Sequence, residues 1–137
     1  MNTPFRLRLR VYYEDTDAAG IVYYANYLKF AERARTEMLR AAGLDHPALL
    51  RTSGLMFAVR RVSIDYRAPA RLDDLLDVEC RIRAVSGARM TMDQSVWRDD
   101  GLLASMLVEL VCIDGGGRAR RLPPNLTQKL NLGAREA

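Results

Sequence analysis

The chain has 137 residues, of which 49% are hydrophobic and 28% are charged, a composition typical of soluble globular proteins. This length suits a single domain with its own core, which we expect to span residues 1–137. The net charge is +4, but the basic residues are spread along the chain, and the motifs of nucleic-acid-binding proteins are absent. These properties argue against a nucleic-acid partner, while a modest positive balance suits an anionic substrate.

The sequence gives no indication of export or membrane insertion. Residues 1–15 alternate between polar and apolar and lack the apolar stretch of a signal peptide. No apolar run approaches the ~20 residues of a membrane-spanning helix. The two cysteines, Cys80 and Cys112, lie inside apolar runs, as expected of buried free thiols in a reducing compartment. We therefore expect a cytoplasmic protein without an integral membrane segment.

The first two elements are a strand and a long helix. Over residues 5–13 apolar side chains alternate largely with arginines, which predicts a half-buried strand, and residues 14–20 are acidic and small, which predicts a turn. Over residues 25–42 apolar and small residues recur every three or four positions, which predicts a helix. Asn26 is a candidate N-cap of this helix, and Gly43 is a candidate C-terminal stop.

The rest of the chain is dominated by strand patterns. After a loop over residues 45–47, apolar patterns predict four strands, over residues 62–66, 76–84, 90–96 and 102–113. The last of these is apolar on both faces, so we expect it to be central in its sheet or covered by another subunit.

Turn signals separate the strands. Ser86-Gly87 predicts one turn, and Asp99-Asp100-Gly101 predicts a hairpin. A short tail over residues 125–132 is expected to be helical. One strand, one helix and then four strands, without a βαβ alternation, favour the α+β class.

Two aspartates, Asp15 and Asp17, are the candidate reactive carboxylates. On spacing alone they could form a carboxylate pair, a metal site or ordinary turn positions, and the preference of aspartate for turns favours the last. The only histidine, His46, lies in a separate loop, so we expect no metal site and no Ser-His-Asp or Cys-His unit. Acyl chemistry would then require a carboxylate, assisted by the N–H groups of the helix N-terminus. Glu32, within the helix, is the next carboxylate to test.

Tyrosines are concentrated around the same turn. We expect them to be core or interface aromatics whose hydroxyls could orient a substrate. They are Tyr12, Tyr13, Tyr23, Tyr24 and Tyr27.

The segment from Tyr13 to Arg35, YEDTDAAGIVYYANYLKFAERAR, resembles the signature of the 4-hydroxybenzoyl-CoA thioesterase family. Members of this family are single-domain hotdog proteins. Within the family, the chain is most similar to the Tol–Pal-associated acyl-CoA thioesterases of bacteria, and the later segment RAPARLDD, residues 67–74, fits the same branch. The resemblance covers nearly the whole chain and implies an α+β hotdog fold, in which a five-stranded antiparallel sheet wraps a long central helix.

The resemblance also implies catalytic roles. Asp17 would be the catalytic carboxylate, acting as a nucleophile through a mixed anhydride or as a general base on water. A backbone N–H near Tyr24 would polarise the thioester carbonyl, and Tyr13 falls at a position associated with the active site. Relatives often carry His where this chain has Tyr24; the backbone role survives that change, but an acid–base role of the imidazole does not. No cofactor is implied, since coenzyme A is part of the substrate.

Substrate binding is implied at two further places. Relatives hold the nucleotide phosphates of CoA near the loop between the middle strands, here residues 86–91. Arg89 is the candidate phosphate contact, because arginine pairs well with phosphate oxygens, and Thr91 lies beside it; an exposed hairpin arginine is the alternative. The strand edge at Val59 is a candidate partner for the pantetheine amides.

The resemblance therefore implies an acyl-CoA thioesterase that acts on short-chain aliphatic or aromatic acyl-CoA and assembles as a homodimer or homotetramer. An alternative function is a binding module for acyl carrier protein or an envelope-biogenesis partner, with little catalysis. A hotdog dehydratase is a third interpretation. It is disfavoured because such enzymes use an active-site histidine, and His46 lies outside the carboxylate segment.

Overall fold

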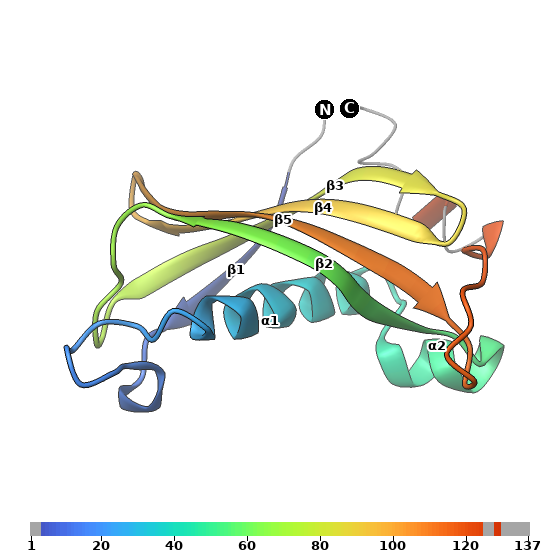
Figure 1. Ribbon diagram of the computed structural model, residues 1–137, viewed down its shortest axis with the longest axis horizontal. Coiled ribbons are helices and arrows are strands. Elements are labelled where there is room, and N and C mark those ends of the chain that lie inside the picture. Colours follow the sequence, from blue (N-terminus) through green and yellow to red (C-terminus); the bar gives the residue numbers. More distant parts are fainter. Residues whose placement is uncertain (1–3, 125–127, 130–137) are drawn as a thin grey trace.

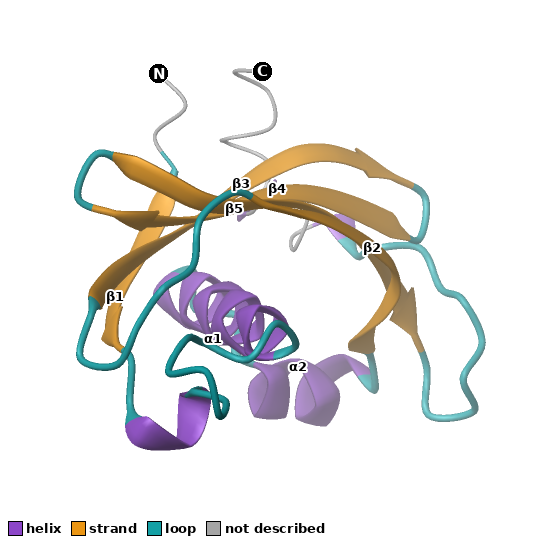
Figure 2. Ribbon diagram, turned by 60° about the vertical axis from the view of Figure 1, so that its left-hand side comes forward, coloured by secondary structure: helices purple, strands orange, loops and turns teal. Residues whose placement is uncertain are grey.

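The computed structural model describes residues 4–124 and 128–129, in which one curved antiparallel sheet covers a long helix (Figure 1). The strands lie in the order β1-β3-β4-β5-β2, and α1 lies on the concave side of the sheet (Figure 2). The predicted α+β hotdog arrangement is thereby confirmed. The elements are β1 (Phe5–Arg10), the 3-10 helix η1 (Tyr13–Asp15), α1 (Asn26–Ala41), α2 (His46–Ser53), β2 (Met56–Tyr66), β3 (Leu75–Ser86), β4 (Arg89–Arg98) and β5 (Gly101–Ile113).

The helix α1 packs against β1, β3 and β4, and the core also contains buried side chains of β5, such as Met106 and Val108. Phe30 and Ala34 are fully buried, and the small side chains on this face let the helix approach the sheet closely. The helix ends where the sequence predicts. Gly43 takes a left-handed conformation with φ 76°, and the Leu44 N–H bonds to the Leu39 carbonyl oxygen at 2.8 Å, as in a glycine-terminated helix.

The prediction that Asn26 caps α1 is wrong. Asn26 is the first helical residue, and the cap position belongs to Ala25, which has no side-chain cap. The Asn26 side chain is buried and donates to Asp15 Oδ1 at 2.9 Å. A long-range partner therefore uses the amide that local sequence rules assign to capping.

The prediction of a loop over residues 45–47 is also wrong, because His46 begins the short helix α2. Asp45 caps this helix by accepting a hydrogen bond from the Ala48 N–H at 2.8 Å. Pro47 lies in the first turn, where its missing N–H costs nothing. The Asp-His-Pro sequence is thus a helix start.

The sheet contains all five predicted strands, but β2 begins at Met56 rather than at residue 62, and β1 ends at Arg10 rather than at residue 13. The apolar strand β5 lies between β4 and β2, which confirms its central position. Arg98 pairs with Gly101 across the predicted hairpin, whose Asp99 has φ 54°. β1 and β2 are the two edge strands. The predicted helical tail over residues 125–132 lies largely outside the described residues.

Both cysteines are buried and free, as the sequence predicts. Cys80 lies on the inner face of β3, and its burial raises the pKa of the thiol to about 12. Such a thiol stays protonated and inert at neutral pH.

An ion pair on the outer face joins the edge strand β1 to β3. Arg8 Nε donates to Asp77 Oδ1 at 3.0 Å, and this bond is the largest of the effects that lower the pKa of Asp77 below its ordinary value of 3.8. A carboxyl whose pKa is lower in the folded state stabilises the fold above the unfolded-state pKa and loses that contribution as pH falls through the folded-state pKa.

We expect stability to fall as pH drops below about 4, and Asp77→Asn to flatten that decline. The Asn side chain cannot titrate, so part of the acid sensitivity should disappear with it. Urea unfolding between pH 7 and pH 2.5 measures both slopes. Equal slopes in the wild type and the variant would show that the Arg8–Asp77 pair does not contribute.

Candidate active site

The carboxylate of Asp15 anchors the loop that precedes α1. Asp15 is 4% exposed; its Oδ2 accepts from the Tyr12 N–H at 2.8 Å, and its Oδ1 accepts from the Asn26 side chain at 2.9 Å. Its carbonyl oxygen accepts from the Tyr23 N–H at 2.9 Å. Asp15 is therefore a structural residue that fixes the loop to the first turn of the helix, rather than half of a carboxylate pair.

Asp17 lies at the first position of a tight turn two residues later. The Gly20 N–H bonds to the Asp17 carbonyl oxygen at 3.0 Å, and the Asp17 N–H bonds to the Ile21 carbonyl oxygen at 2.9 Å. Gly20 has φ 79°, a conformation that glycine adopts without strain. A bridge between Thr16 and Val22 closes this small hairpin, so the position of Asp17 is fixed by backbone hydrogen bonds.

The Asp17 carboxylate is exposed and only partly engaged. Its Oδ1 accepts from the Ala19 N–H at 2.9 Å, and within residues 4–124 no hydrogen bond reaches its Oδ2. Its negative charge is felt by the neighbouring Tyr23, whose pKa is raised mainly by Tyr24 and further by burial and by Asp17. One carboxylate oxygen is held and the other is free to react.

The N-terminus of α1 presents free backbone donors beside this loop. The N–H groups of Tyr24 and Ala25 make no hydrogen bond to any residue that the structure describes. No side chain caps the helix there, so its partial positive charge is left for an anion.

Two hydrogen bonds set the direction of those donors. The Tyr23 carbonyl oxygen accepts from the Asn26 N–H at 2.8 Å, and the Tyr24 carbonyl oxygen accepts from the Tyr66 hydroxyl at 2.8 Å. In a trans peptide the N–H points opposite to the carbonyl, so both peptide planes, and the N–H groups of Tyr24 and Ala25, are fixed in advance. Fixed donors are what a developing oxyanion requires.

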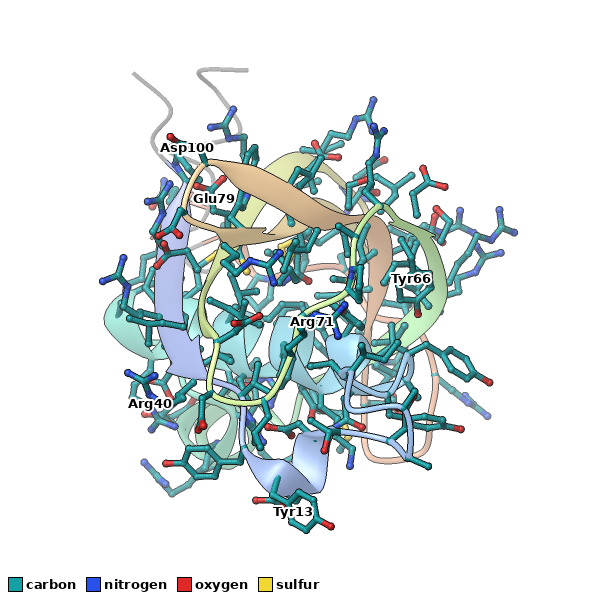
Figure 3. The ribbon with its side chains drawn as sticks, turned by 90° about the vertical axis from the view of Figure 1, so that its left-hand side faces the viewer. Tyr13, Arg40, Tyr66, Arg71, Glu79 and Asp100 are labelled. Carbon is teal, nitrogen blue, oxygen red and sulfur yellow. The ribbon has the colours of Figure 1, made fainter. Side chains whose placement is uncertain are left out.

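The tyrosines surround this helix end but only one belongs to the core. Tyr27 is 3% exposed, while Tyr24 is 63% and Tyr13 is 83% exposed. Tyr12, Tyr13, Tyr23 and Tyr24 are therefore not core residues, and their location at an interface stays a prediction. Figure 3 shows Tyr13 on η1 at the outer end of the loop, well away from Tyr66.

Tyr66, from the end of β2, is a site residue that the sequence analysis missed. Its ring packs edge-on against Tyr27 at 5.3 Å and Tyr24 at 6.4 Å between centroids, in addition to its bond with the Tyr24 carbonyl. It is 42 positions from Tyr24 in sequence, and no local pattern links the two. Only the folding of β2 alongside α1 brings them together.

Two cavities follow the seam between α1 and β2. The proximal cavity, about 320 Å³, lies at the helix start between Tyr24, Tyr27 and Tyr66. The distal cavity, about 270 Å³, lies further along the helix between Leu28 and Val59. Both have mainly apolar walls, so the seam suits an acyl group that enters from the N-terminus of α1.

Of the predicted substrate-binding residues, Val59 lines the distal cavity, while Arg89 and Thr91 lie on β4. The residues of β4 alternate in burial, with Met90 and Met92 inward, so Arg89 and Thr91 face outward. Figure 1 shows the β3–β4 turn and the η1 loop at opposite ends of the molecule. Within one chain, Arg89 and Asp17 are therefore not brought together.

Residues 4–124 and 128–129 contain no group of three His, Cys, Asp or Glu side chains that could hold a metal ion. No helix within those ranges is long and apolar enough to cross a membrane.

Known proteins are similar to this chain in both sequence and fold. Residues 19–105 match the model of the thioesterase superfamily. The chain is 44% identical over 116 residues to the acyl-CoA thioesterase YbgC of Haemophilus influenzae, covering 85% of each protein. A probable thioesterase from Bartonella henselae, 39% identical, superposes with a TM-score of 0.84 over 88% of this chain and 100% of that one. A 1,4-dihydroxy-2-naphthoyl-CoA thioesterase from Synechocystis, 26% identical, gives 0.83 over 98% of this chain and 97% of that one.

The sheet wrapped around α1 is a hotdog fold, and the acyl-CoA thioesterases among the relatives place the chain in the class of thioester hydrolases. The sequence match over residues 19–105 gives this class its family: the chain belongs to the thioesterase superfamily.

Proposed function

We propose that the chain is an acyl-CoA thioesterase, in which Asp17 is the catalytic carboxylate and the Tyr24 N–H binds the oxyanion. The observation that carries this proposal is the arrangement around the start of α1. A carboxylate with one free oxygen and a pair of fixed, unpartnered N–H groups occupy one short segment that backbone hydrogen bonds hold in place. Membership of the thioesterase superfamily supports the reaction type.

The chemistry follows from the two groups. The thioester carbonyl oxygen accepts from the Tyr24 N–H, and the partial positive charge of the helix end stabilises the negative charge that develops there. If Asp17 is the nucleophile, its Oδ2 attacks the carbonyl carbon, CoA leaves as the thiolate, and water hydrolyses the mixed anhydride. If it is a general base, Oδ2 takes a proton from a water molecule, which attacks instead. Both routes give the free acid and CoA, and neither needs a metal or cofactor.

Tyr13 and Tyr24 have different roles in this proposal. Tyr24 contributes its backbone N–H, which is independent of its side chain, and its exposed ring lines the proximal cavity. Tyr13, at the edge of the loop, would contact substrate as it enters. Since relatives often have His at the Tyr24 position, we assign to this residue an influence on acyl preference and rate, not on reaction type.

The proposed CoA contacts require an oligomer. The Val59 edge of β2 is unpaired within the chain and is available to pantetheine amides or to a second subunit. Because Arg89 and Asp17 lie at opposite ends of the sheet, the Arg89 and Thr91 that serve one Asp17 belong to a neighbouring subunit. We therefore propose a homodimer or homotetramer of single-domain chains, each spanning residues 1–137.

The biological setting is proposed from similarity alone. The likeness to the YbgC thioesterase, together with the resemblance to the Tol–Pal-associated branch, supports a cytoplasmic enzyme with a Tol–Pal association. The substrate is a short-chain aliphatic or aromatic acyl-CoA, and acyl carrier protein is a second acyl donor to test. No nucleic-acid partner is proposed.

Thiol release from a panel of acyl-CoAs, from acetyl to benzoyl, tests the proposed function. We expect saturable hydrolysis of at least one ester in buffer that contains a metal chelator. If no ester is hydrolysed by folded protein, but the chain binds acyl carrier protein, the binding-module alternative replaces the enzyme.

A further inference from the structure

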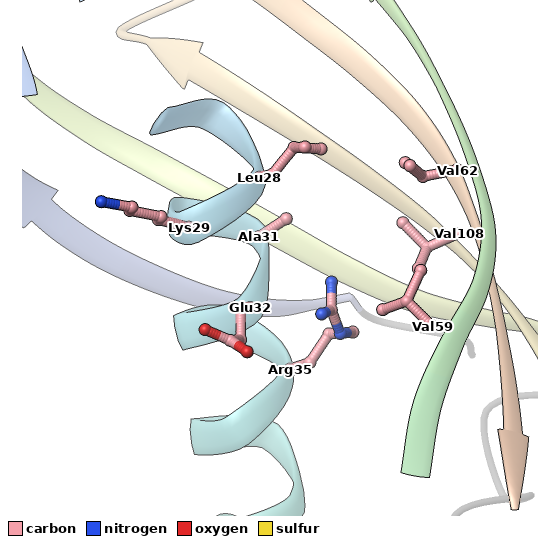
Figure 4. A pocket seen from close by; sticks show the side chains of 8 residues that line it. All are labelled: Leu28, Lys29, Ala31, Glu32, Arg35, Val59, Val62 and Val108. Carbon is pink, nitrogen blue, oxygen red and sulfur yellow. The ribbon is translucent and has the colours of Figure 1, made fainter. Parts of the chain in front are cut away.

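Three charged side chains line the distal cavity among its apolar walls: Lys29, Glu32 and Arg35. Figure 4 shows that the Lys29 and Glu32 side chains point away from the strands, whereas the Arg35 guanidinium lies between α1 and the strand residues Val59 and Val108. The remaining walls include Leu28 and Ala31, and Leu28 is 40% exposed although it is apolar. The cavity is therefore an open apolar slot that ends at a cation.

The Arg35 guanidinium has few partners within the protein. Its Nη1 donates to Gln94 Oε1 at 3.0 Å, and no carboxylate of the described residues lies within 4.0 Å of it. Gln94 cannot turn away, because its Nε2 donates to the Ala31 carbonyl oxygen at 3.0 Å and to Cys80 Sγ. Burial lowers the pKa of Arg35, against smaller opposing effects of Cys80 and Glu32. Among the described residues no further hydrogen bond of this guanidinium is found, so several of its five N–H donors have no protein acceptor.

The spacing of the helix aligns this cation with the proposed reaction centre. Leu28, Ala31 and Arg35 are separated by three and four residues, which places them along one face of α1, and Tyr24 lies just before the first turn of this helix. From Leu28 to Arg35 the helix rises ~10 Å. An acyl chain whose carbonyl lies at the Tyr24 N–H would pass Leu28 and Ala31 before it meets Arg35.

We propose that Arg35 is the residue that limits acyl-chain length. A hydrocarbon chain that reaches Arg35 strips water from the guanidinium and offers no hydrogen-bond acceptor in return, which is costly. A chain that stops short of it fills the apolar part of the cavity and leaves the cation hydrated. This inference rests on the proposed function and narrows its substrate class to short acyl groups.

The test is kcat/KM for straight-chain acyl-CoAs from acetyl to lauroyl, measured on the wild type, Arg35→Met and Arg35→Lys. The wild type should prefer the short esters. Arg35→Met replaces the cation with an unbranched apolar side chain and should raise the lauroyl-to-butyryl ratio about tenfold or more, the gain expected from burying about two further methylenes. The change should fall mainly on KM. Arg35→Lys keeps the charge and should keep the wild-type preference.

Arg40→Met, on an exposed arginine near the other end of α1, is the matched control and should leave the ratio unchanged. If circular dichroism shows that Arg35→Met is folded and its lauroyl-to-butyryl ratio is unchanged, this inference is overturned while the proposed function stands. A wild type that hydrolyses lauroyl-CoA as well as butyryl-CoA would also overturn it, a result that needs no variant. A wild type inactive on every ester would overturn the proposed function and this inference with it.

Discussion

Asp17→Asn should lower kcat for acyl-CoA hydrolysis about 1,000-fold or more, a loss of about 4 kcal/mol in transition-state stabilisation. The amide can neither attack the thioester nor accept a proton from water, so both proposed roles of the carboxylate are removed. The fold should survive, because the Asn oxygen can still accept the Ala19 N–H that Asp17 Oδ1 accepts now. KM should change little, since the substrate contacts lie elsewhere.

A matched control variant tests whether the loss of activity is specific to Asp17. Asp99→Asn changes another exposed aspartate, in the β4–β5 hairpin, whose φ of 54° suits asparagine. It should keep wild-type kcat. Folded Asp17→Asn with near-wild-type turnover would refute the carboxylate mechanism, whereas equal losses in both variants would point to a general effect of charge.

Labelled water can identify a nucleophilic Asp17. In a single turnover with excess enzyme in heavy-oxygen water, a nucleophilic Asp17 passes through an anhydride, and attack of water on the aspartyl carbonyl puts the label in the Asp17 carboxylate. General base catalysis, or attack of water on the acyl carbonyl of the anhydride, puts the label only in the released acid. Label in the peptide that contains Asp17, measured by mass spectrometry, therefore establishes the nucleophilic route.

Asp15→Ala should have the second-largest effect, and it should act on both stability and activity. The substitution leaves the Tyr12 N–H and the buried Asn26 amide without their acceptors. Unsatisfied buried donors and lost charged hydrogen bonds together are expected to cost about 3 kcal/mol. The loop that carries Asp17 loses its anchor to α1, so kcat should fall even under conditions in which the protein remains folded.

Urea unfolding and steady-state kinetics on the same preparation measure both effects. Glu14→Ala, at the exposed neighbouring position, is the control and should change stability by less than about 0.5 kcal/mol. If Asp15→Ala is as stable and as active as the control, the buried carboxylate does not hold the site together. If Asp15→Ala loses stability but keeps full activity, Asp15 stabilises the fold without positioning Asp17 for catalysis.

The sequence by itself determined most of the regular elements of this protein, although it did not predict the helix α2. The helix predicted over residues 25–42 is found as Asn26–Ala41, and the hairpin at Asp99-Asp100-Gly101 lies where the turn residues predict. These features depend on side-chain periodicity and on the conformations of glycine and aspartate, which act over a few residues. The family signature supplied Asp17 and the N–H near Tyr24 as candidates, because both belong to one short segment.

Only the tertiary structure decided which distant residues hold that segment in place and which side chains line the cavities beside it. Asn26 looked like a helix cap by local rules, yet it pairs with buried Asp15. No sequence pattern pointed to Tyr66 or Arg35. Tyr66 fixes the peptide that follows Tyr24 through a hydrogen bond to the Tyr24 carbonyl oxygen, and Arg35 lines the distal cavity. Their roles depend on contacts between the helix and strands that lie far away in the chain. Local propensity contains no information about such contacts, since packing and burial determine which distant polar groups become partners.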